Sequence, residues 1–171
     1  MVIFTWICAL LAVLALCMAL RLWWAWRQLK NHPHVEPLHI AAPHIAPELN
    51  QMINNIASIA GITAPETYIW RGRFGNAFVA ATIMRHELFL SDELFESCDQ
   101  CDDALEQLTK VICHEIAHIQ RNDAIRLGTL TYIANICSEI GLNKVSSRCQ
   151  MAIKHIENET DIQGNILMQQ L

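Results

Sequence analysis

The chain has 171 residues, a hydrophobic fraction of 53% and a formal net charge of −5. This length suits one domain with a short appendage, and the hydrophobic fraction is high for a domain that is soluble throughout. The acidic balance and the lack of a basic stripe exclude nucleic acid as a partner.

The apolar excess lies at the amino terminus. Val2 to Leu20 is a run of 19 residues without a charge. As a helix this run would be about 28 Å long, close to the ~30 Å hydrocarbon core of a bilayer. Tryptophans and basic residues follow up to Lys30, as they do at a membrane interface. No basic residues precede the run and no small-x-small site follows it, which favours an uncleaved anchor over a signal peptide.

We therefore expect residues 1–30 to form one N-terminal transmembrane helix. The positive charges lie on the carboxyl side of this helix. The positive-inside rule then places the remaining domain in the cytoplasm, in a single-pass protein of a bacterial inner membrane.

Residues 31–47 carry four of the five prolines and four of the eight histidines. Prolines at this density keep the backbone extended, so the segment is predicted to be a semi-rigid linker. The histidine spacing fits no chelate on a helix or turn, which favours solvated side chains over a metal-collecting tract. The domain proper is then expected over residues 48–171.

The cysteines of the domain are odd in number and irregularly spaced, which indicates reduced thiols. Cys98 and Cys101 form a C-x-x-C, and no second pair is present to complete four zinc ligands. We interpret them as two thiols in an acidic turn, with a redox pair or half of a zinc knuckle as the alternative.

Periodicity predicts an α+β domain that is mainly helical with a small β-sheet or hairpin. Gly61 is a natural stop for the helix that begins at Glu48. Asp102 or Asp103 is suited to cap the helix that carries on to about Gln120. The expected helices are Glu48–Ala60, a turn at Asp92–Ser97, a long helix up to about Gln120, a core helix at Leu127–Leu142 and a last helix at Ser146–Gln169. The expected strands are Glu66–Trp70, Asn76–Thr82 and its hairpin partner Glu87–Ser91.

The sequence "VICHEIAHIQRND" contains the pattern H-E-x-x-H at His114, Glu115 and His118. On a helix the two histidines stand one turn apart, roughly 5–6 Å at Cβ, so both rings can reach one zinc ion. Glu115 is too close in sequence to be a comfortable ligand, but it can accept a proton from the attacking water and pass it to the leaving amine. The alternative is two polar histidines on a half-exposed helix face.

A zinc hydrolase also needs a third protein ligand. The last helix carries Glu157 and Asp161 one turn apart, on one side of the helix. If this helix crosses the first, Glu157 completes a His-His-Glu site, and Asp161 orients a ligand histidine by accepting its second ring N–H. Glu159 points away from this side and is the weaker candidate. The alternative for Glu157 is an ordinary solvated carboxylate.

H-E-x-x-H followed by a separate helix with E-x-x-x-D resembles the HtpX-type and CAAX prenyl endopeptidase membrane metallopeptidases, which are gluzincins. The upstream "NAF" and "ELFLSDELFE" are similar to further elements of that family. The resemblance covers roughly residues 47–164 and implies a zincin-like core with one Zn²⁺ per chain. It implies the ligands His114, His118 and Glu157, Glu115 as general base and Asp161 as supporting carboxylate. It also implies that a polypeptide substrate pairs with the strand residues Asn76, Ala77, Phe78, Val79 and Ala80.

The chain departs from the larger members of that family, which have several membrane spans and further helices that supply part of the cleft. In those members a basic or imidazole side chain also serves the oxyanion, and Arg121, Arg148 and Lys154 are the cations available here. We expect a membrane-anchored zinc metalloendopeptidase that cleaves membrane-associated or misfolded proteins, and either a protein partner completes its cleft or its substrates are few. The alternative is a zinc-binding, non-proteolytic protein of membrane assembly.

Overall fold

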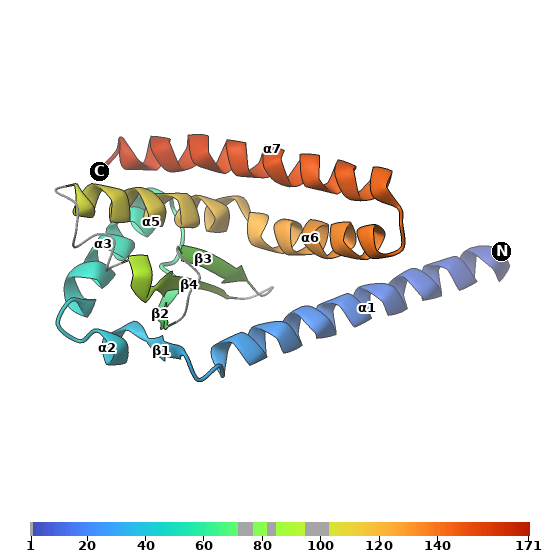
Figure 1. Ribbon diagram of the computed structural model, residues 1–171, viewed down its shortest axis with the longest axis horizontal. Coiled ribbons are helices and arrows are strands. Elements are labelled where there is room, and N and C mark those ends of the chain that lie inside the picture. The colour runs from blue at the N-terminus through green and yellow to red at the C-terminus, as the bar shows by residue number, and fades with distance from the viewer. Residues whose placement is uncertain (1, 72–76, 82–84, 95–102) are drawn as a thin grey trace.

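The computed structural model describes residues 2–71, 77–81, 85–94 and 103–171. Within these ranges the chain is mainly helical and carries one four-stranded sheet, so the predicted α+β class is confirmed (Figure 1). The helices are α1 (Val2–Lys30), α2 (Leu38–Ala41), α3 (Ala46–Ile59), α5 (Ala104–Arg121), α6 (Asp123–Glu139) and α7 (Asn143–Met168). The strands are β1 (Val35–Pro37), β2 (Glu66–Trp70), β3 (Ala77–Ala81) and β4 (His86–Ser91).

The sheet has the order β1-β2-β4-β3, so β3 is an edge strand. β3 pairs antiparallel with β4, with Val79 opposite Leu88, which confirms the predicted hairpin. β2 pairs in parallel with β4 and antiparallel with β1. Among the described strands β3 has a partner on one side only, so a further strand could pair with its other edge.

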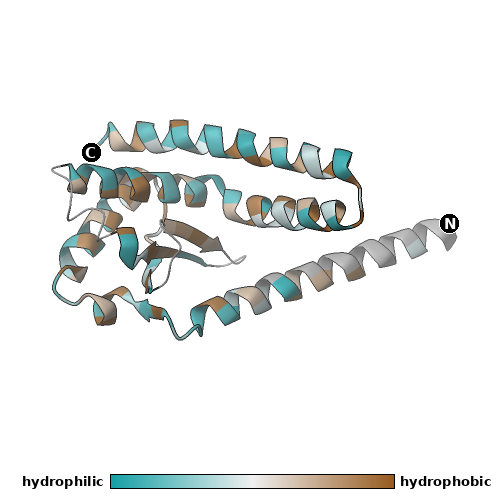
Figure 2. Ribbon diagram, in the orientation of Figure 1, coloured by the Kyte–Doolittle hydropathy of each residue, from teal (hydrophilic) through white to brown (hydrophobic). Residues whose placement is uncertain are grey.

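The core lies between α3, α5 and the sheet. It is built from side chains that recur at helical spacing on the two helices and alternate along the strands. Figure 2 shows apolar residues on the strands and on the adjoining helices. The fully buried residues of the core include Ile53, Ile56, Leu88, Leu90, Ile112 and Ile116.

Left-handed turns end the helices α3 and α5. Gly61, just past α3, has a φ of +69°, a left-handed conformation that glycine adopts without strain. The chain leaves α5 through Asn122, which also has a left-handed φ of 56°, and enters α6 at once. This second turn brings Asp123 back beside the last turn of α5.

The predicted linker differs from the structure. Residues 35–41 form β1 and α2, and Leu38 is only 2% exposed. Pro37 ends the strand, and the apolar residues after it pack on the core although the surrounding prolines favour extended backbone. The predicted core helix after residue 127 also differs, because α6 buries only Asp123, Ala134 and Cys137 and pairs with α7 at the edge of the domain.

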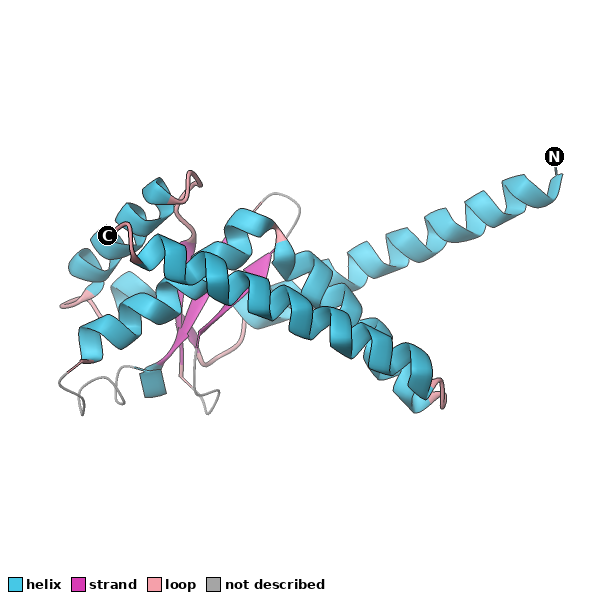
Figure 3. Cartoon of the chain, turned by 90° about the horizontal axis from the view of Figure 1, so that it is seen from above, coloured by secondary structure: helices cyan, strands magenta, loops and turns pink. Residues whose placement is uncertain are grey.

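α1 and the α6–α7 pair both extend beyond the sheet (Figure 1), and the view from above shows that they point in different directions (Figure 3). The carboxyl end of α1 is tied to the sheet: Trp26 Nε1 donates to Glu87 Oε2 at 2.6 Å, and Lys30 Nζ donates to Glu87 Oε1 at 2.9 Å. In the part of the chain that the structure describes, no helix combines the length and apolarity needed to cross a membrane. The transmembrane anchor therefore stays a prediction.

Four cysteines in the described ranges, Cys17, Cys113, Cys137 and Cys149, are free thiols. Cys98 and Cys101 lie outside the described residues, as does Asn76. The predicted helical turn after Ser91 is seen at residues 92–94, and its remainder lies outside them too.

Candidate metal centre

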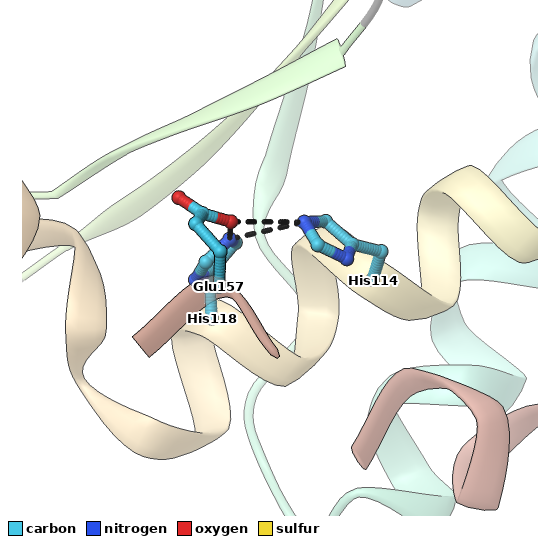
Figure 4. A group of neighbouring side chains, drawn as sticks. All are labelled: His114, His118 and Glu157. Atoms are coloured by element: carbon cyan, nitrogen blue, oxygen red, sulfur yellow. Dashed lines mark hydrogen bonds and ion pairs between the residues drawn. The ribbon is translucent and has the colours of Figure 1, made fainter. Parts of the chain in front are cut away.

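α5 and α7 together hold three side chains that can bind a metal. His114 and His118 stand one turn apart on α5, and Glu157 reaches them from α7 (Figure 4). The two histidine Nε2 atoms are 3.1 Å apart. Glu157 Oε2 lies 3.3 Å from His118 Nε2 and 3.6 Å from His114 Nε2.

These separations fit a tetrahedral zinc site. Zinc binds imidazole nitrogen and carboxylate oxygen at about 2.0–2.2 Å, so neighbouring tetrahedral ligand atoms lie about 3.3–3.5 Å apart. The three measured distances surround that value, and each atom faces the other two. Within the described ranges it is the one such group of histidine, cysteine, aspartate or glutamate side chains. The set leaves the fourth tetrahedral position to water or substrate.

Asp161 directly contacts His114, the more exposed of the two histidines. Its Oδ1 lies 2.9 Å from His114 Nδ1, one helical turn beyond Glu157 on α7. The Nδ1–H of His114 therefore donates to this carboxylate and the Nε2 lone pair faces the metal position, which is the tautomer that a ligand needs.

His118, the buried histidine, has a different neighbour at its Nδ1 atom, which the sequence analysis did not predict. His118 is 6% exposed, and its Nδ1 lies 3.3 Å from the hydroxyl of Thr160, a fully buried residue of α7. Thr160 Oγ1 is in turn 3.3 Å from Asp123 Oδ2, and Asp123 is also fully buried. A signal for Thr160 was present, because it lies three residues after Glu157 and so on nearly the same side of the helix.

Asp123 is paired with two guanidinium groups. Arg121 Nε lies 2.7 Å from Asp123 Oδ2, and Arg126 Nη1 lies 3.1 Å from Oδ1. Arg121 also pairs with Glu159, so this cation and the weaker carboxylate candidate are bound to each other beside the site. His155, which also neighbours Glu159, takes no part in the metal group.

Burial sets the protonation behaviour of Glu115 and His118. Burial raises the pKa of Glu115 to about 8, the Glu157 carboxylate adds to the rise, and a hydrogen bond from the Val79 backbone acts against it. Burial also lowers the pKa of His118, which favours the neutral imidazole that a metal requires. A divalent cation beside Glu115 would favour its charged form, which is the form that accepts a proton.

A cavity of about 930 Å³ opens onto the metal group. His114, Glu115, His118 and Glu157 line one part of it, and the edge strand β3 lines another through Ala77, Phe78 and Val79. Ala80 lies in the same strand but does not line the cavity. The predicted substrate strand and the predicted metal ligands thus share one cleft.

The other walls come from elements that the sequence did not assign to the site. Arg21, Trp24 and Ala25 of α1 line the cavity, as do Gly128, Tyr132 and other residues of α6. Arg21 Nη1 donates to the Tyr132 hydroxyl at 2.8 Å, so the two helices are joined across the cleft. Of the cations in the described ranges, Arg21 lines this cavity, whereas Arg148 and Lys154 do not.

A helix carrying H-E-x-x-H and a crossing helix that adds a glutamate define the class of His-His-Glu metallopeptidases. A model of peptidase family M48 matches residues 43–166, which include α5 and all but the last two residues of α7. The chain belongs to peptidase family M48, a family of zinc metallopeptidases. No solved structure matches the chain.

Proposed function

We propose that the chain is a membrane-anchored zinc metalloendopeptidase that hydrolyses peptide bonds of membrane-associated or misfolded proteins. One observation carries this proposal. Three ligand atoms at zinc spacing, a buried glutamate and an open strand edge line the same cavity. Zinc, when bound, would act as a Lewis acid toward water and the scissile carbonyl.

The chain's own groups divide the remaining work. An extended polypeptide would pair with the free edge of β3, so that its backbone runs along Ala77–Ala81 past the histidines. Glu115 would take a proton from the attacking water and deliver it to the leaving amine. The backbone of Val79 hydrogen-bonds Glu115, so β3 and the proposed general base lie next to each other.

The membrane part of the proposal depends on α1. Its first 19 residues after Met1 carry no charge, and tryptophans with basic residues follow. Since α1 also lines the cleft, an anchor at this position would hold the site close to the bilayer and to polypeptides that leave it. The charge asymmetry favours a cytoplasmic domain at a bacterial inner membrane. Full-length chain should sediment with membranes and resist extraction by alkaline carbonate, whereas release by carbonate would contradict an integral anchor.

The catalytic role is tested with purified full-length chain, by zinc content and by cleavage of an unfolded polypeptide. Wild type should contain one zinc and cleave. Glu115→Gln should keep the zinc and lose about 10²-fold or more of the activity, because only the proton acceptor is removed. His114→Ala should lose zinc. The matched control is Glu106→Gln, an exposed carboxylate on the same helix.

Full cleavage by Glu115→Gln would contradict the proposed mechanism. Stoichiometric zinc with no cleavage by wild type, together with unchanged biological function of Glu115→Gln, would favour the non-proteolytic assembly protein. An absence of zinc in wild type would contradict both functions.

A further inference from the structure

We propose that Thr160 and Asp123 are positioning residues for the ligand His118, acting as a buried hydroxyl relay that fixes its tautomer and ring orientation. The inference rests on the proposed metal site and goes beyond its ligands. The carrying observation is a continuous chain of contacts at 3.3 Å each, from His118 Nδ1 to Thr160 Oγ1 and from Thr160 Oγ1 to Asp123 Oδ2.

Burial makes this relay necessary. His118 is 6% exposed, so solvent has little access to its Nδ1 atom. A metal ligand must keep the Nε2 lone pair free, which places the ring proton on Nδ1, and a buried N–H needs an acceptor. Thr160 Oγ1 is the acceptor that the described structure places beside this atom.

The direction of the hydroxyl proton decides whether the relay works. A threonine hydroxyl has one proton and two lone pairs. Besides His118, Thr160 Oγ1 faces two oxygen acceptors, the Ile156 carbonyl at 3.0 Å and the Asp123 carboxylate at 3.3 Å. Both neighbours other than His118 are acceptors only, so the single hydroxyl proton is donated to an oxygen, which the relay assigns to the charged Asp123 carboxylate, and a lone pair is left for the Nδ1–H of His118.

Asp123 can be buried and charged because it is neutralised. Two guanidinium groups, those of Arg121 and Arg126, pair with its two oxygens. Without the Thr160 hydroxyl or the Asp123 carboxylate, the His118 ring could turn or carry its proton on Nε2. A proton on Nε2 would block the metal position. The two ligand histidines are thus supported differently: His114 by a direct, exposed carboxylate and His118 by a buried hydroxyl and the carboxylate behind it.

The test uses zinc affinity, measured on full-length chain by competition with a chromogenic chelator. Thr160→Val keeps the shape and removes the hydroxyl, and it should weaken zinc binding about 10- to 100-fold, as changes to groups behind a ligand typically do. Thr160→Ser should restore wild-type affinity. Thr109→Val is the matched control, because Thr109 also bonds the carbonyl four residues back but touches no ligand.

A second measurement needs no variant and stands even if Thr160→Val does not fold. In zinc-loaded wild type labelled with ¹⁵N-histidine, His118 should give an Nδ1–H resonance that is protected from exchange with water. An unprotected His118 Nδ1–H would overturn the relay, as would wild-type zinc affinity in a folded Thr160→Val chain or a Thr160→Ser chain as weak as Thr160→Val. No zinc binding by wild type would instead overturn the metal site itself, and the relay with it.

Discussion

At the scale of single residues, the two ligand histidines differ in exposure, and this difference governs how each is held. The side chain of His114 is 27% exposed and that of His118 is 7% exposed. Water can therefore compete for the outer ring but hardly for the inner one. The carboxylate that supports His114 belongs to Asp161, which is itself 64% exposed. A solvent-screened contact of this kind contributes less than a buried one.

This comparison predicts the effect of removing the Asp161 carboxylate. Asp161→Ala should weaken zinc binding by about tenfold, the lower end of the range for groups behind a metal ligand, because water can replace the lost acceptor. The loss should be measured by chelator competition against Glu106→Gln as control. A loss larger than that of Thr160→Val would contradict the ranking of the two supports by burial.

The sequence predicted five of the site residues, because their spacing is a local property. His114, Glu115 and His118 lie within one helix, and Glu157 and Asp161 repeat the one-turn spacing on another. Asp123 was missed because its place depends on a left-handed turn at Asn122, and Thr160 because its role depends on where the two helices cross. The turn leaves no periodic pattern, and the spacing of Thr160 from Glu157 gives its side of the helix but not the histidine that it meets.

At the scale of elements, the approach of α7 to α5 determines whether Glu157 reaches the histidines. The two helices pack tightly at Gly164, where an added Cβ would lie 3.1 Å from His114 Cα and 3.2 Å from His114 N. Backbone atoms cannot move aside as a flexible side chain can. Gly164 therefore permits the close packing that places Glu157, two turns earlier on α7, at the metal position.

Gly164→Ala should consequently disturb both stability and the metal site. The close contact should lower the free energy of unfolding by about 1–3 kcal/mol, and the higher helix propensity of alanine should restore about 1 kcal/mol of this loss. Zinc affinity should also fall, because Glu157 moves away from the histidines. Gly128→Ala in α6 is the control, since nothing lies within 4 Å of its Cβ position and it should be neutral or stabilising. Urea unfolding and chelator competition would measure the two effects, and equal behaviour of both variants would contradict the close crossing.

The sheet shows where prediction from sequence reaches its limit at this scale. The β3–β4 hairpin follows from two strand-forming segments close in sequence, and the structure confirms it. The parallel pairing of β2 with β4 skips β3 and depends on how the sheet folds as a whole. β1 and α2 lie among prolines, whose local preference for extended backbone is overridden when Leu38 packs into the core.

At the scale of the whole molecule, the cleft is assembled from both ends of the chain. Glu87, whose side chain is 1% exposed, receives hydrogen bonds from Trp26 and Lys30 and so fixes α1 to the sheet. Earlier in α1, Arg21 donates a hydrogen bond to Tyr132 on α6. α1 thereby forms one wall of the cavity.

The contact between Arg21 and Tyr132 gives a test of this wall. Tyr132→Phe removes the acceptor of the 2.8 Å hydrogen bond and retains the ring, over which the guanidinium lies at 5.8 Å. A hydrogen bond to a charged group at an exposed site is worth about 1 kcal/mol, so the KM for an unfolded polypeptide should rise by up to about fivefold. Zinc affinity and kcat should stay unchanged, because neither residue belongs to the metal group.

Arg21→Gln should have a similar effect, and the double variant should lose little more than either single one, since both changes break the same contact. Arg148→Gln, an exposed arginine that does not line the cavity, is the control. Additive losses would mean that the two side chains act on the substrate independently. An unchanged KM in both single variants would show that the contact between α1 and α6 does not contribute to substrate binding, and the substrate would then be held by the other walls of the cavity, β3 among them.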